Sequence, residues 1–191
     1  MVERLKAVGQ RSINNLVDIS NYVLLEMGHP THIFDYDKLD RKEILVRRAI
    51  KGEKLISLDE AEHELIETQL LITDGKSPIA LAGVMGGLSS AVTEQTTTVL
   101  VESAYFNPIT IRKSAKSLQM NTDASKRFER GADPEGAEKG FWHVVELLQE
   151  LADGELMSEM VDEYPLAVTQ SNLTLRLSLI HISAPTRPLY I

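Results

Sequence analysis

The chain has 191 residues, 43% hydrophobic and 25% charged, a balance typical of a globular protein that buries a substantial core. It contains no cysteine, which excludes a disulfide framework, a thiolate nucleophile and a cysteine-ligated zinc site. No apolar run reaches the roughly 18 residues of a membrane span, and the N-terminus lacks a signal-peptide pattern. We therefore expect a cytoplasmic protein with no membrane partner.

The formal net charge of −8 argues against general affinity for nucleic acid, but the charges are unevenly spread. Residues 112–130 hold six basic and two acidic side chains, whereas residues 141–170 hold seven acidic side chains and no lysine or arginine. A local basic surface on an acidic body can dock an RNA end, and a solvated helix face accounts for the same residues equally well. The sequence leaves both interpretations open.

Residues 1–11 are predicted to be an incoming linker or strand, and a helix follows from a Ser12 N-cap to Gly28. Asn14, Asp18 and Asn21 form a polar row along this helix. Such residues weaken a helix interior, so the row suggests hydrogen-bond partners in neighbouring backbone or in a ligand. The predicted apolar stripe consists of Ile13, Leu16, Val17, Leu24 and Met27, with Ser20 beside them.

The middle of the chain predicts a loop over residues 28–35 and then short strands separated by turns. The strands are expected at residues 44–48, 55–58, 70–72, 78–82 and 98–106. Three glycines within residues 83–87 permit close approach of the backbone to a ligand, although their spacing is not that of a dinucleotide fingerprint. Glu102 lies in the mostly apolar last strand, so it either has a buried partner or faces outward.

Two further helices are predicted, one over residues 108–116 and a longer one that begins with Asp133 as N-cap and Pro134 as first residue. A strand is expected at residues 157–164. Residues 177–191 resemble translated flanking sequence and are treated as a non-native tail. The fold class is therefore α+β, with short-stranded mixed or antiparallel sheets, flanking helices and a pocket between the lobes; residues 12–176 form a single module.

Five ordered segments together resemble the tRNA-editing module of the bacterial-type phenylalanyl-tRNA synthetase beta subunit. The resemblance covers about residues 5–176 and implies hydrolytic deacylation of mischarged Tyr-tRNA(Phe). It implies as partners the tRNA(Phe) acceptor end, the tyrosyl group and, in the parent enzyme, an alpha subunit. It implies no cofactor here, because ATP and Mg²⁺ serve the parent's aminoacylation. The segments are Arg11-Ser-Ile-Asn-Asn, Asp18-Ile-Ser-Asn-Tyr-Val, Gly28-His-Pro-Thr-His-Ile-Phe-Asp, Ala82-Gly-Val-Met-Gly-Gly and Asn121-Thr-Asp-Ala-Ser-Lys-Arg-Phe-Glu-Arg-Gly.

The resemblance also assigns substrate-binding roles. Glu102 matches the glutamate that binds the phenolic hydroxyl of tyrosine, and Gly86 matches a glycine that makes room for the aminoacyl group. Thr122 and Ala124 match small residues that line the opposite side of the pocket. Arg11 matches an arginine near the mouth, where it would face the tRNA terminus.

The implied catalytic residues are His32, Asn21 and Ser20. His32 would orient or deprotonate the attacking water, or hold the ester while an adenosine hydroxyl assists. Ser20 replaces the family's commoner threonine and keeps the hydroxyl. His29 replaces a glutamine and Thr31 an apolar residue, two departures that could alter how His32 is held.

No covalent intermediate is expected, because the chain has no Ser-His-Asp order and no cysteine. No metal site is expected either, because His29 and His32 lack a third ligand at supporting spacing. Two other functions remain open. The segment could be a non-catalytic module that binds a tRNA acceptor end or supports assembly, or a free-standing aminoacyl-tRNA deacylase.

Overall fold

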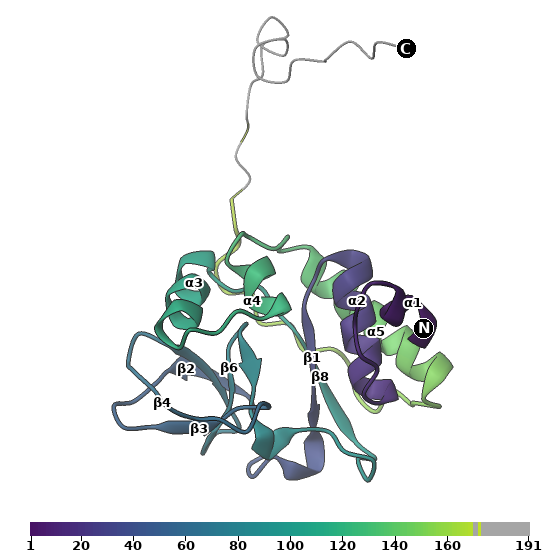
Figure 1. Ribbon diagram of the computed structural model, residues 1–191, viewed down its shortest axis with the longest axis horizontal. Helices are drawn as coiled ribbons and strands as arrows, with labels where there is room; N and C mark the ends of the chain where they lie inside the picture. The colour runs from purple at the N-terminus through teal and green to yellow at the C-terminus, as the bar shows by residue number, and fades with distance from the viewer. Residues whose placement is uncertain (170–171, 173–191) are drawn as a thin grey trace, which may run out of the picture. The chain divides into compact units, whose positions relative to one another are not determined.

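The computed structural model describes residues 1–169 and 172 (Figure 1). The chain divides into two units, Met1–Glu159 and Met160–Ile191. All the helices and strands given below lie in the first unit. The strand predicted at residues 157–164 does not form, and the predicted tail lies outside the described residues. In the described part, no helix is long and apolar enough to cross a membrane.

The strands form three small antiparallel sheets in the described part of the chain. This confirms the α+β class and the short strands, five of which begin within one residue of the predicted positions. The first sheet pairs β1 (Thr31–Asp35) with β8 (Val99–Ser103), and the third pairs β3 (Lys54–Ile56) with β4 (Glu62–Glu64). The second has the order β2 (Leu45–Arg48), β5 (Leu70–Thr73), β6 (Pro78–Leu81) and β7 (Met85–Gly86).

The helices pack in two groups (Figure 1). The helix α2 (Asn15–Met27) and the long helix α5 (Gly136–Leu151) lie side by side against β1 and β8, whereas α3 (Pro108–Ser117) and α4 (Asp123–Phe128) lie together near the second sheet. The expected linker or strand over residues 1–11 is wrong: Val2–Ala7 form the short helix α1, which packs against α2 through the buried Leu5.

The N-terminus of α2 corrects the predicted cap. Asn14, rather than Ser12, is the N-cap, and its side-chain oxygen accepts a hydrogen bond from the amide of Val17. Ser12 instead donates to the carboxylate of Asp18, which also accepts from the amide of Ile13 at 2.9 Å. Two members of the polar row therefore bind nearby protein groups and hold the chain that enters the helix.

The buried face of α2 agrees with the predicted stripe only in part, since Leu24 of that stripe is buried. Ile19 and Val23 are fully buried, whereas Ile13 precedes the helix and is 67% exposed. The reason is tertiary: α2 is covered by both β1 and α5, and the face between them decides which residues are buried. Ile19 and Val23 belong to a smaller core cluster, which also contains Ile33, Val144 and Leu148.

The start of α5 lies two residues later than predicted. Asp133 and Pro134 form a turn in which the Asp133 side chain accepts from the amide of Glu135, and the helix begins at Gly136. On this helix Val144, Val145 and Leu148 are buried, whereas Leu151 is exposed. The first residue of the helix, Gly136, lies against His29, because a Cβ atom there would be 3.0 Å from Nδ1 of His29.

The paired strands β1 and β8 separate two cores. Side chains alternate between the faces of a strand, so Ile33 enters the smaller cluster while Phe34 enters a larger cluster beside the second sheet. Helices α3 and α4 contribute Ile111 and Phe128 to that larger cluster. The face of β1 and β8 that carries Phe34 is the one on which the candidate site lies.

Candidate functional site

The structure brings His32 and Glu102 together across the first sheet. The predicted loop over residues 28–35 is partly wrong, because Thr31–Asp35 form β1. In the antiparallel pairing of β1 with β8, His32 lies directly opposite Glu102. Directly opposed residues project from the same face, so the imidazole and the carboxyl group share one side of the sheet. Two residues separated by 70 positions in the sequence are thus neighbours.

Gly86 lies directly against the imidazole of His32. A Cβ atom built on Gly86 would be 2.6 Å from Cε1 and 2.7 Å from Nε2 of His32, and 3.1 Å from Cδ1 of Leu58. The amide of Leu58 donates to the Gly86 carbonyl at 3.0 Å, which fixes the turn between β3 and β4 beside the glycine. The missing side chain at Gly86 therefore allows the backbone to approach the histidine.

The side-chain polar atoms of His32 and Glu102 have no hydrogen-bond partner among the described residues, although both side chains are partly accessible. Their surroundings withdraw them from water, and this desolvation lowers the pKa of His32 to about 4 and raises the pKa of Glu102 to about 7. At neutral pH His32 is uncharged and Glu102 is close to its midpoint. An accessible ligand with polar groups could satisfy both side chains.

These pKa shifts predict opposite effects on stability. Glu102 binds its proton more tightly in the folded than in the unfolded state, so its ionisation destabilises the fold as pH rises from about 4.5 through 7. His32 stays neutral in the fold to about pH 4, so acidification below its unfolded pKa of about 6.5 destabilises the fold. Between about pH 4.5 and 6.5 the two effects offset each other.

The variant Glu102→Gln removes one of these opposing effects. We expect its free energy of unfolding to match that of the unsubstituted chain near pH 4.5 and to exceed it by up to about 3 kcal/mol at pH 8. Urea unfolding at several pH values measures this difference. The exposed Glu94→Gln serves as the control, for which no pH-dependent gain is expected. A difference that is constant with pH would contradict the assigned shift.

Thr122 is attached to the turn that carries Gly86. Its hydroxyl donates to the carbonyl of Val84 at 2.7 Å and accepts from the amide of Ser125 at 3.0 Å, within a capping box at the start of α4. Ala124, in the first turn of α4, is partly buried against the larger core. The structure thus brings Thr122 to the Gly86 turn, with the proton of its hydroxyl already engaged.

Arg11 lies next to the start of α4. The preceding residue, Gln10, donates from its side-chain amide to the carboxylate of Asp123 at 3.0 Å. Arg11 itself is exposed and makes no ion pair with any residue between 1 and 169. Its side chain is therefore available for a contact with another molecule, one residue from the contact between Gln10 and α4.

Ser20 contacts β1 at the residue before His32. The Ser20 hydroxyl donates to the carbonyl of Thr31 at 2.7 Å and lies 3.0 Å from the Thr31 hydroxyl. Thr31 and His32 point to opposite faces of β1, so Ser20 anchors the strand from the side away from the imidazole. Asn21 is partly buried, and its side-chain amide makes no hydrogen bond within the described part.

The sequence did not predict the contacts of two residues near the site, Leu58 and His29. Leu58 contacts Gly86 only because Ser57 pairs with Gly87, a long-range contact with no local sequence signal. His29 is 3% exposed and packs edge-on against Phe128 with ring centroids 6.1 Å apart. Neither of its ring nitrogens has a hydrogen-bond partner among the described residues. Its position against α4 and α5 could not be inferred from the departure from glutamine alone.

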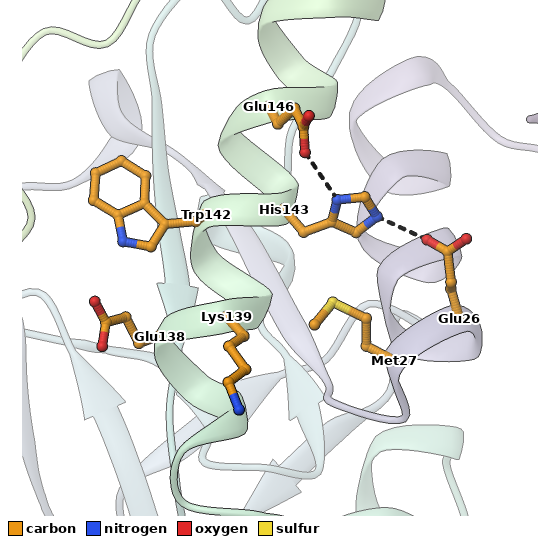
Figure 2. A pocket seen from close by; sticks show the side chains of 7 residues that line it. All are labelled: Glu26, Met27, Glu138, Lys139, Trp142, His143 and Glu146. Carbon is orange, nitrogen blue, oxygen red and sulfur yellow. Dashed lines mark hydrogen bonds and ion pairs between the residues drawn. The ribbon is translucent and has the colours of Figure 1, made fainter.

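An open groove lies elsewhere, between α2 and α5 (Figure 2). His143 lies in it between Glu26, at 2.7 Å, and Glu146, at 3.3 Å. Burial opposes protonation of His143, but these carboxylates outweigh it and raise its pKa. None of the predicted site residues lines this groove, and the predicted pocket between lobes stays a prediction. The groove between α2 and α5 is lined by Glu26, Met27, Glu138, Lys139, Trp142, His143 and Glu146.

Comparison with known proteins places this geometry in context. A family model described as the B3/4 domain matches residues 1–153, which include every predicted site residue. The chain is 49% identical over 162 residues to a phenylalanine–tRNA ligase beta subunit of Syntrophus aciditrophicus, covering 85% of this chain and 20% of that protein. The beta subunit of Thermotoga maritima is 45% identical over 176 residues, covering 92% and 22%. The chain thus spans about a fifth of the length of these relatives.

Proposed function

The chain belongs to the B3/4 domain family, and from this premise we propose that it hydrolyses the aminoacyl ester of mischarged Tyr-tRNA(Phe) as the editing module of a phenylalanine–tRNA ligase beta subunit. The observation that carries the proposal is the placement of His32 opposite Glu102, with Gly86 against the imidazole. One polar group can then bind the tyrosine side chain while another holds the reacting end.

The need for such a site follows from the limits of binding. An apolar site for phenylalanine rejects an added hydroxyl by only about 10²-fold, so accurate charging needs a second, hydrolytic site. That site must prefer tyrosine. Glu102 suits this task, because its carboxyl group is withdrawn from water and has no partner among the described residues. A phenolic hydroxyl would supply the hydrogen bond that phenylalanine cannot.

The proposed chemistry is direct attack of a water molecule on the ester. His32 is neutral at physiological pH, so Nδ1 or Nε2 can accept a hydrogen bond from that water. A pKa of about 4 makes the ring a weak base, since efficient general bases have pKa values near the working pH. We therefore assign His32 to positioning the water or the ester, and Gly86 to leaving room for the acyl group.

The remaining residues act around this pair. Thr122 fixes α4 on the Gly86 turn, and Ser20 fixes the start of β1. Arg11 is assigned to the tRNA terminus. The partners are the acceptor end of tRNA(Phe) and the alpha subunit of a cytoplasmic ligase. Aminoacylation, with its ATP and Mg²⁺, is assigned to other parts of that enzyme.

A deacylation assay tests the proposal. The 191-residue chain is expected to hydrolyse Tyr-tRNA(Phe) faster than Phe-tRNA(Phe), and His32→Ala is expected to slow the tyrosyl reaction about 100-fold, since misplaced reacting groups cost about this much. His143→Ala, which changes a histidine in the groove between α2 and α5, should keep full activity. Binding of tRNA without hydrolysis of either ester would instead support a non-catalytic module.

A further inference from the structure

Two neighbouring segments present a concentration of positive charge. The exposed face of α3 carries Arg112, Lys113 and Lys116, and all three side chains are exposed. Lys126 and Arg127 follow in α4 and are partly exposed, and Arg130 lies just beyond its end. Helices α3 and α4 pack against each other and lie side by side in Figure 1. We call these six residues the α3–α4 basic surface.

Most of this charge is unpaired. Arg112, Lys113, Lys116 and Arg130 form no ion pair with any residue in the described ranges, whereas Lys126 and Arg127 share the single carboxylate of Asp123 at 3.6 and 3.9 Å. Many other basic residues of the chain are paired. Lys6 binds Glu3, Lys54 binds Glu62 and Lys76 binds Asp40, each within 3.1 Å. The surface is therefore a local excess of positive charge on a chain of net charge −8.

The same two helices rest on the turn that positions Gly86. A Cβ atom on Gly83 would lie 3.0 Å from Ile111 of α3 and 3.1 Å from Phe128 of α4. Three residues span at most about 11 Å of chain, so Gly83 and Gly86 are close in space. A helix of ten residues is about 15 Å long, which places the cations of α3 within roughly 25 Å of the candidate site.

From these contacts we propose that the α3–α4 basic surface binds the RNA phosphate backbone next to the aminoacylated end, and so delivers the ester to His32 and Glu102. The inference rests on the proposed editing function. One strand of a B-form duplex carries one phosphate per roughly 3.4 Å of helix axis, and on this scale a 25 Å span covers about seven phosphates. Without local cations, an acidic chain would repel this ligand.

Direct binding of uncharged tRNA(Phe) tests the surface without any hydrolysis. The triple variant Arg112→Gln/Lys113→Gln/Lys116→Gln is expected to raise the Kd at least tenfold at low salt. It should also reduce the slope of log Kd against log salt by about 2 to 3, because each lost phosphate contact removes about 0.7 to 0.9. The measurement is a titration of labelled tRNA at several salt concentrations.

A matched control separates a local effect from net charge. The control variant Lys6→Gln/Lys54→Gln/Lys76→Gln also removes three positive charges, but from lysines that are already paired with carboxylates. This variant should bind tRNA within about twofold of the unsubstituted chain. Equal losses in the two triple variants would overturn the proposal, because only net charge would then matter. Unchanged binding in both would show a solvated helix face and would also overturn it.

A substrate without phosphates separates this inference from the editing function. Tyrosyl-adenosine carries the same ester, so the α3 triple variant should hydrolyse it at the unsubstituted rate while its kcat/KM for Tyr-tRNA(Phe) falls at least tenfold. Loss of both activities would overturn the docking role. The unsubstituted chain could hydrolyse neither substrate and still bind tRNA. If the α3 triple variant then bound tRNA more weakly and the control triple variant did not, the docking surface would stand and the editing function would fail.

Discussion

Replacing Gly86 by alanine is expected to lower the rate of Tyr-tRNA(Phe) deacylation about 100-fold while the protein stays folded. The new methyl group would lie 2.6 Å from Cε1 of His32, well inside van der Waals contact. The imidazole can swing away because it is a side chain, but it would then leave its place opposite Glu102. A displacement of about 1 Å at a reacting group can cost this factor.

The same substitution is also expected to lower the free energy of unfolding. Overpacking of this kind costs roughly 1–3 kcal/mol. In the double variant Gly86→Ala/His32→Ala the ring is gone, so most of that cost should disappear. Urea unfolding of the single and double variants therefore measures the contact between the two residues, as a coupling free energy.

Gly140→Ala provides a matched control for crowding a histidine. Its Cβ atom would lie 3.2 Å from Cδ2 of His29, a histidine to which no role in the reaction is assigned. This variant is expected to change stability and to keep the deacylation rate. If Gly86→Ala hydrolysed the tyrosyl ester as fast as Gly140→Ala, the close approach of Gly86 to His32 would have no part in the reaction.

The local elements of the fold were largely predictable from the sequence. Alternating apolar residues predicted β2, and Asn107-Pro108 and Thr122 mark the starts of α3 and α4 through side-chain caps. The cap of α2 was misplaced because Ser12 and Asn14 are both good N-caps. The structure chooses Asn14, since Asp18 engages the hydroxyl of Ser12.

Elements that depend on distant partners were not predictable in this way. Strand β1 follows a glycine and a proline and has no clear alternation, yet it forms because β8 pairs with it. The two-residue strand β7 exists only through its pairing with β6. Propensity is a weak guide wherever tertiary contacts decide the conformation.

The candidate site shows the same division. The sequence marked Glu102 as a carboxylate in an apolar strand and residues 83–87 as a glycine-rich turn. Nothing in their spacing places Glu102 opposite His32 or Gly86 against the imidazole, so their grouping came from the resemblance to a family. The resemblance did not predict the contact that Ser20 makes. Its hydroxyl binds Thr31, on the face of β1 opposite to that of His32.

Removing the carboxyl group of Glu102 should change selectivity more than hydrolysis itself. A hydrogen bond to a charged group is worth roughly 1.5–3 kcal/mol, and each 1.4 kcal/mol is a factor of ten. Glu102→Ala is therefore expected to lower the ratio of kcat/KM for Tyr-tRNA(Phe) over Phe-tRNA(Phe) by about 10- to 100-fold. The phenylalanyl ester, which has no hydroxyl to bind, should react at the unsubstituted rate.

The pH dependence of the same ratio tests which form of Glu102 recognises tyrosine. Because desolvation raises the pKa of Glu102 to about 7, the carboxylate predominates above that pH and the neutral acid below it. A phenol donates more strongly to a carboxylate than to a neutral carboxyl group. The preference for the tyrosyl ester should therefore rise between pH 6 and 8, and Glu102→Gln should remove this rise.

Taking the ratio of the two esters cancels the effect of hydroxide on hydrolysis in general. His32 does not distort the profile, because its pKa of about 4 keeps it neutral throughout this range. Equal losses on both esters in Glu102→Ala, with a flat ratio in the unsubstituted chain, would show that Glu102 shapes the site without recognising the hydroxyl. A rise that survives in Glu102→Gln would assign the recognition to another titrating group.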